Sequence, residues 1–354
     1  MILSRSCGAR GFRAVLVATF LLSACAEADR RDVPPAVDST ALRVPPRVSE
    51  VYLSRTDSLP ELQGLAIWQP AEGEPRIVVS ASTENAIQLR NWSDGSLIEE
   101  YRRRGRGAGA LDAPVGMATH DSLVFVVEKT NHRVQAFRLP SFEALGSFGN
   151  EELIAPEWIA LLRQGRNVDA YVSDRADLSP DTAVATRIRI FRLNLDGQRL
   201  SAGLMRTFGE EGGLAYIRAI VIDSAQDRIL VADRSAGVIA FTLGGDAAGL
   251  RISADVFAGA PGGLALHACG RDNGHVFVTD TARSFHVFDR ETLAAVTRFW
   301  GRTLAPTADI LFAGMPDPAS SRLLAVHARS GIGAIAWPVM SDSIPTLRAC
   351  PDGS

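Results

Sequence analysis

The chain lacks an apolar run long enough to cross a bilayer as a helix, which needs about 20 residues. A nine-residue apolar core, 14–22, lies near the N-terminus behind Arg5, Arg10 and Arg13. A short apolar core that follows a positively charged segment is typical of a secretory signal peptide. We therefore expect residues 1–24 to be a signal peptide and the remainder of the chain to be exported.

Cysteine is scarce, with four in 354 residues. Cys7 falls within the signal, and Cys25 ends the segment Leu22-Ser23-Ala24-Cys25. This segment resembles the lipobox of bacterial lipoproteins, which implies cleavage before Cys25, diacylation of its thiol and attachment to a membrane. Ala26 stands where a lipoprotein retained in the inner membrane would carry Asp, which favours the outer membrane or the periplasmic face. The alternative is an ordinary secretory signal with a chance cysteine.

Two cysteines, Cys269 and Cys350, follow the predicted lipid anchor. In an oxidising compartment such a pair predicts a disulfide bond. The sequence has no C-x-x-C pair and no Cys/His cluster, which argues against a structural zinc site. It also has no G-x-S-x-G motif, the signature of a serine nucleophile in α/β-hydrolases.

Lysine is almost absent: of 37 basic residues, only Lys129 is a lysine. The formal charge is −3, and loss of residues 1–24 removes three Arg and no acid, which gives −6. A negative chain argues against nucleic acid as a partner. Arg104 and Arg106, in the run 102–106, and Arg234 are candidates for a phosphate clamp. The glycines around 102–109 fit a solvated turn equally well.

The sequence also lacks a sustained helical period. Residues 25–47, with two Pro-Pro pairs, predict a flexible tether, residues 48–342 one globular domain, and residues 343–354 a C-terminal tail. Within the domain a short apolar strand recurs six times, at intervals of a propeller blade. The copies are 64–68, 116–120, 158–162, 219–223, 263–267 and 309–313.

A turn and further strands with period 2 follow each copy, which indicates an all-β fold. Six copies predict a six-bladed β-propeller of four-stranded antiparallel blades. The last copy lacks a fourth strand after Trp337, while 50–54 is an unpaired strand at the start. We expect the N-terminal strand to complete the last blade and close the ring. Trp68, Trp158 and Trp337 are interpreted as packing between blades, and 175–185 as a polar loop inserted in blade 3.

The last residue of each second strand forms one aligned column. Its members are Ala81, Glu128, Asp174, Asp233, Asp280 and His327. Four carboxylates at one end of the channel could gather around Ca²⁺, which prefers several oxygen ligands. Alternatively, each acid only caps the turn to the third strand by accepting hydrogen bonds from backbone N–H groups.

Two family resemblances involve this column. Blade 2, with Asn131-His132-Arg133, resembles an NHL repeat. Most of the chain resembles the β-propeller phytases, on segments 62–68, 228–241, 262–293 and 307–310. That resemblance implies Ca²⁺-dependent hydrolysis of phosphomonoesters such as phytate.

The acids of the phytase family are replaced at several of these positions, by Gln63-Gly64, Arg234, Gly262 and Ala308, and Asp233 is retained. The prediction is therefore a phytase-like propeller lipoprotein with Glu128, Asp174, Asp233 and Asp280 as metal ligands. The alternative is a non-catalytic, NHL-like propeller that binds a protein or a small ligand, phosphorylated or not, at the cell envelope.

Overall fold

The computed structural model describes residues 44–55, 61–175, 187–196, 199–209, 213–327 and 331–347. Cys25, Cys350, most of the predicted tether and most of the blade 3 insertion lie outside the described residues. The tether's last residue, Arg47, already belongs to a strand. No helix in the described ranges is both long and apolar enough to span a bilayer.

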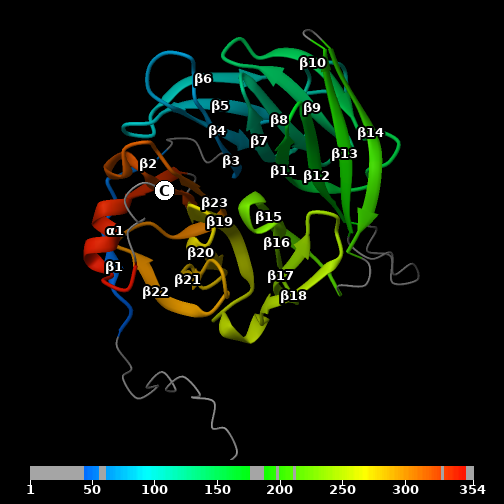
Figure 1. The fold of residues 1–354 in the computed structure, drawn as a ribbon. Coiled ribbons are helices and arrows are strands. Elements are labelled where there is room, and N and C mark those ends of the chain that lie inside the picture. Colours follow the sequence, from blue (N-terminus) through cyan, green and yellow to red (C-terminus); the bar gives the residue numbers. More distant parts are fainter. Residues whose placement is uncertain are drawn as a thin grey trace, which may run out of the picture. The chain divides into compact units, whose positions relative to one another are not determined.

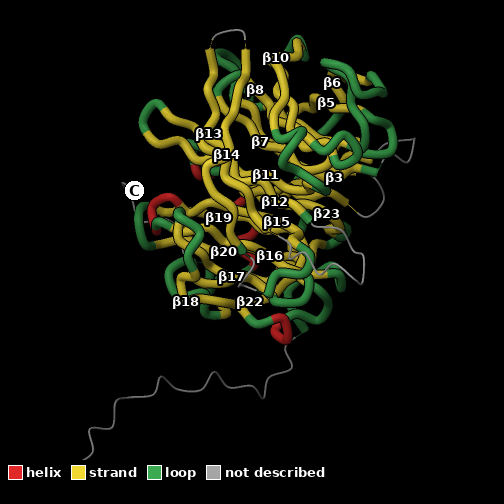
Figure 2. The backbone as a smooth tube through the Cα atoms, turned by 90° about the vertical axis from the view of Figure 1, so that its right-hand side faces the viewer, coloured by secondary structure: helices red, strands yellow, loops and turns green. Residues whose placement is uncertain are grey.

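The predicted fold is confirmed: six four-stranded antiparallel blades form a β-propeller (Figure 1). The strands were expected because short apolar segments of period 2 are separated by turns. Figure 2 shows strands through most of the domain, with helix only in short pieces.

The strands of the six blades follow one another in chain order, except that the N-terminal β2 is the fourth strand of blade 6. Blade 1 comprises β3 (Leu62–Trp68), β4 (Arg76–Ala81), β5 (Ala86–Asn91) and β6 (Leu97–Arg102). Blade 2 comprises β7 (Pro114–His120), β8 (Leu123–Glu128), β9 (Arg133–Arg138) and β10 (Glu143–Phe148). Blade 3 comprises β11 (Pro156–Gln164), β12 (Asn167–Asp174), β13 (Arg187–Asp196) and β14 (Arg199–Phe208). Blade 4 comprises β15 (Ile217–Asp223), β16 (Arg228–Asp233), β17 (Gly237–Thr242) and β18 (Ala247–Ile252). Blade 5 comprises β19 (Pro261–Cys269), β20 (Asn273–Asp280), β21 (Phe285–Asp289) and β22 (Ala295–Gly301). Blade 6 comprises β23 (Pro306–Ala313), β24 (Arg322–His327), β25 (Gly331–Ala336) and the N-terminal β2 (Tyr52–Arg55).

The ring closes as predicted, because β2 pairs antiparallel with β25 as the outer strand of blade 6. A second N-terminal contact was not predicted: the two-residue β1 (Arg47–Val48) pairs parallel with β22. The N-terminal segment thus covers the outer edges of blades 5 and 6, which would otherwise expose unpaired backbone groups.

Trp337 was expected to end the third strand of blade 6. In the structure it instead begins helix α1 (Trp337–Ser343), so that expectation was wrong. Pro338 ends the run of ladder hydrogen bonds and suits the first turn of a helix. The Trp337 ring lies 4.0 Å from that of His267, and the Met340 side chain is fully buried. The helix therefore packs against blades 5 and 6.

Hydrophobic clusters fill the spaces between adjacent blades, with Phe125 and Phe277 fully buried. A buried ion pair also joins blades 4 and 5, because the Arg290 guanidinium donates to both oxygens of Asp223. Arg228 donates to the same carboxylate. These side chains are at most 4% exposed, so this cluster is structural and not open to a ligand.

Candidate functional site

The first strand of every blade lines the central channel. Each first strand contacts the next one around the ring, and β23 contacts β3 to complete it (Figure 1). All six first strands carry a bulge near their start, where the register against the second strand shifts. A bulge re-aims side chains. It therefore decides which residues face the opening of the channel.

The acids of the column accept hydrogen bonds from nearby backbone N–H groups. Asp233 accepts four backbone hydrogen bonds: Ala215 and Tyr216 donate to Oδ2, and Ser235 and Ala236 donate to Oδ1. This carboxylate is 0% exposed. All of its acceptor capacity is used within blade 4 and the loop that leads into it.

The other three acids are occupied in the same way. Asp174 accepts from the backbone of residues 154 and 155 and from Arg189. Asp280 accepts from the Ser284 backbone and contacts His286. Glu128 accepts from the Asp112 backbone and from the side chains of Asn131, Arg133 and Gln135.

The column therefore does not converge on a shared cation position. Within the described ranges, no group of three or more Asp, Glu, His or Cys side chains is placed to hold a metal ion. Protein donors already surround each of the four carboxylates that the column proposes as metal ligands, including Asp233, the one that the phytase resemblance also retains.

The arginine candidates do not meet at one site either. Arg102 forms ion pairs with Glu84 and Glu100. Arg104 takes part in an isolated bridge with Leu111, and Arg106 lines a rim cavity of about 250 Å³ with Asn131 and other residues. The Arg234 backbone donates to the Tyr216 carbonyl.

Cys269 is 2% exposed and is disulfide-bonded. Its predicted partner, Cys350, lies outside the described residues, so this pairing stays a prediction.

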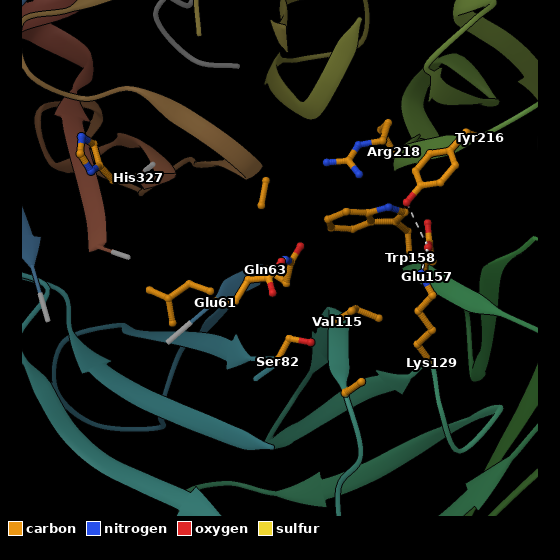
Figure 3. A pocket seen from close by; sticks show the side chains of 13 residues that line it. Glu61, Gln63, Ser82, Val115, Lys129, Glu157, Trp158, Tyr216, Arg218 and His327 are labelled. Atoms are coloured by element: carbon orange, nitrogen blue, oxygen red, sulfur yellow. Dashed lines mark hydrogen bonds and ion pairs between the residues drawn. The ribbon is translucent and has the colours of Figure 1, made fainter. Parts of the chain in front are cut away.

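A cavity of about 450 Å³ lies at one opening of the channel (Figure 3). Three of its lining residues, Gln63, Glu157 and Arg218, directly follow the residue at which the bulge of their first strand begins. Lys129, the chain's single lysine, and His327 also line it. We call this cavity the mouth.

The charges in the mouth are unevenly paired. Lys129 forms an ion pair with Glu157, and the Tyr216 hydroxyl donates to Oε1 of Glu157 at 3.2 Å. The guanidinium of Arg218 lies 5.5 Å from the centre of the Tyr216 ring. Within the described part of the chain, Arg218 forms no hydrogen bond or ion pair. A half-buried positive charge therefore faces the cavity with no carboxylate in contact, although it lies close enough to Asp309 to act on that carboxyl.

Trp158 is the unusual member of the mouth. The equivalent bulge positions hold small residues in four other blades, namely Gly64, Gly116, Ala219 and Gly263. A Cβ on Gly64 or Gly116 would lie within 2.5 Å of a backbone oxygen of the next blade. In blade 3, by contrast, the indole fills this position and is 6% exposed. Its Nε1 is buried and has no hydrogen-bond partner among the described residues.

Beyond the mouth, the channel contains a second cavity of about 360 Å³, which we call the channel cavity. Trp158 lines both cavities. The walls are mainly aliphatic, and Asp309 is the one titratable side chain among those that line it. The Leu65 backbone donates to Oδ2 of Asp309 at 2.9 Å. Asp309 is half-buried, and its partial desolvation raises the pKa of its carboxyl to about 7, although the Leu65 hydrogen bond and the charge of Arg218 oppose that shift.

The comparisons with known proteins agree with this fold. One solved structure, described as a nidogen/laminin complex, has 14% identity and a TM-score of 0.51, with 72% of this chain and 85% of that chain covered. A second, hydrazine synthase of Kuenenia stuttgartiensis, has 13% identity and a TM-score of 0.50, with 79% and 84% covered. These similarities show the fold alone. No protein-family model matches the chain, and no curated protein sequence matches it.

Proposed function

We propose that this propeller is a binding protein whose mouth holds a small organic anion. The observation that carries the proposal is the pairing of Arg218, a half-buried cation with no carboxylate in contact, with the buried and unpartnered indole N–H of Trp158. Figure 3 shows both side chains at the same cavity.

The indole N–H of Trp158 and the guanidinium of Arg218 are hydrogen-bond donors without an acceptor among the described residues. A buried polar group without a partner costs about 1–3 kcal/mol, which a ligand oxygen would recover. Guanidinium groups bind carboxylates and phosphates in a fork geometry, and charged hydrogen bonds are the stronger ones. Lys129 already compensates Glu157, so the acid in the mouth does not repel an anion at Arg218 as an isolated carboxylate would.

Binding of anions can be tested on Arg218 directly. We expect butyrate, used as a small carboxylate probe, to shift the ¹⁵N–¹H NMR signal of the Trp158 indole, which a Trp158→Phe variant assigns. Arg218→Gln should weaken this binding about tenfold, which corresponds to one lost charged hydrogen bond. Arg251→Gln, on the exposed outer strand of the same blade, is the matched control and should bind as the wild type does. An unshifted indole signal at saturating butyrate would remove the basis of the proposal.

The phytase resemblance supports a second proposal, Ca²⁺-dependent release of phosphate from phytate. The four acids of the column, of which Asp233 also belongs to the phytase-like segment, make protein hydrogen bonds, as described above, so the binding function is the better supported of the two. Phosphate release by the purified protein, with calcium and with chelator, distinguishes them. Calcium-dependent turnover of phytate would favour the hydrolase.

We propose further that the protein is held at the cell envelope by a lipid on Cys25, on the strength of the Leu22–Cys25 segment. A Cys25→Ser variant expressed in a bacterial host should lose lipid labelling and leave the membrane fraction. A single acyl chain binds membranes only marginally, whereas a multiply acylated cysteine anchors stably, so the change in fractionation should be nearly complete. Unchanged membrane association would contradict the anchor.

A further inference from the structure

We infer that the anion is the carboxylate of an unbranched alkyl chain, with the carboxylate at Arg218 and the chain in the channel cavity. This inference rests on the proposed binding function and specifies its ligand class. It is drawn from three features of the two cavities: their continuity, the apolar walls of the second, and the position of the charges.

The mouth and the channel cavity are adjacent along the same strands. On β3 the lining passes from Gln63 in the mouth to Leu65 in the channel cavity, and on β7 it passes from Val115 to Met117. On β15 the step is from Arg218 to the next residue, Ala219, and Trp158 belongs to both linings. A ligand held at Arg218 therefore has the channel cavity beside it.

The walls of the channel cavity suit an alkyl chain. Leu161, Val221, Leu266, Leu311 and Phe312 line it and are only half-buried, since they face the channel. Apolar surface that meets water in a confined space is stabilised when an apolar ligand covers it. With Asp309 as the single titratable residue of the lining, the cavity offers little to a strongly polar ligand.

The charges fix the direction of the ligand. Arg218 lines the mouth, whereas the side chain of Asp309, close enough to interact with the Arg218 charge, lines the channel cavity. A carboxylate group is attracted to Arg218 and is poorly solvated among the aliphatic walls of the channel cavity. The acid therefore stays in the mouth, and a second carboxylate at the far end of the chain would be disfavoured.

Chain length gives the test. We expect calorimetric titration of the purified protein with butyrate, hexanoate and octanoate to show affinity rising about fourfold per methylene, the value for burial of one CH₂ group. Suberate, a dicarboxylate with as many carbons as octanoate, should bind at least tenfold more weakly than octanoate. Octanol, which keeps the chain and lacks the charge, should also bind more weakly than octanoate.

A variant locates the chain. Ala118 lines the channel cavity and is half-buried, so Ala118→Phe should reduce the gain from butyrate to octanoate while butyrate binding stays unchanged. Ala247→Phe, on the exposed outer strand β18, is the control and should keep the full gain.

The outcomes separate the two proposals. Equal affinity for butyrate, octanoate and suberate would overturn the alkyl-chain inference and leave the anion site in place. No binding of any carboxylate would overturn both. Because the suberate comparison uses the unaltered protein, it decides the question even if Ala118→Phe fails to fold.

Discussion

Replacing Asp309 with asparagine is expected to stabilise the folded protein by about 2–4 kcal/mol at pH 8 and by less than half as much at pH 5. The cause is the position of Asp309 in the channel cavity, where removal from water raises the pKa of its carboxyl from 3.8 to about 7. One pKa unit corresponds to about 1.4 kcal/mol between protonation states.

The sign follows from proton binding. Below pH 4 the carboxyl of Asp309 is protonated in both the folded and the unfolded protein, so it costs nothing to fold. Between pH 4 and 7 the unfolded chain releases this proton and the folded one keeps it, so the free energy of unfolding falls as pH rises. Above pH 7 the full cost of the partly desolvated charge persists. Asparagine carries no charge at any of these values, and its oxygen can still accept the Leu65 N–H.

Urea unfolding at pH 5 and pH 8 measures this difference. Asp255→Asn, at an exposed position, is the control and should shift both curves by less than about 0.5 kcal/mol. An Asp309→Asn variant equally destabilised at both pH values would mean that the carboxyl makes a hydrogen bond the amide cannot replace. Our account of Asp309 would then be wrong.

The sequence was sufficient for the blade count because each blade repeats one local pattern. It was also sufficient for the closing strand β2. The sequence shows an unpaired strand at the N-terminal end of the domain and a blade that lacks its fourth strand at the C-terminal end, and pairing the two completes the ring. The two misses have different causes. β1 has only two residues, so it carries no periodic signal and is defined by its partner, β22. Helix α1 is seven residues long and follows directly from a strand, which leaves too short a segment for a helical period.

The site was predicted less completely than the fold. The acidic column was aligned correctly, but an alignment does not say whether carboxylates point to a common centre or to their own turns. That direction depends on which backbone N–H groups of the adjoining turns and loops lie within reach, and these are set by the three-dimensional fold. Trp158 did carry a visible signal, because it occupies a position that is Gly or Ala in four other blades. Arg218 carried none, since only the fold places it in the mouth beside Trp158.

Asp233→Asn is expected to destabilise the fold by roughly 3 kcal/mol. Both oxygens of Asp233 accept two backbone N–H groups each. Asparagine replaces one of these oxygens with an NH₂ group, which is itself a donor. The two backbone N–H groups that this oxygen accepted are then left without an acceptor, and each unsatisfied donor costs about 1–3 kcal/mol.

Asp227→Asn makes the same chemical change in the same blade, at an exposed turn residue with positive φ, a conformation that asparagine tolerates. It should leave the free energy of unfolding nearly unchanged. Millimolar calcium should leave the melting temperature of wild-type protein unaltered, because the Asp233 oxygens have no acceptor capacity left for a cation. A melting temperature that rises with calcium in the wild type and not in Asp233→Asn would contradict this assignment. It would show that the cation displaces the backbone donors of the turn, and that Asp233 is a metal ligand in a blade that rearranges to bind it.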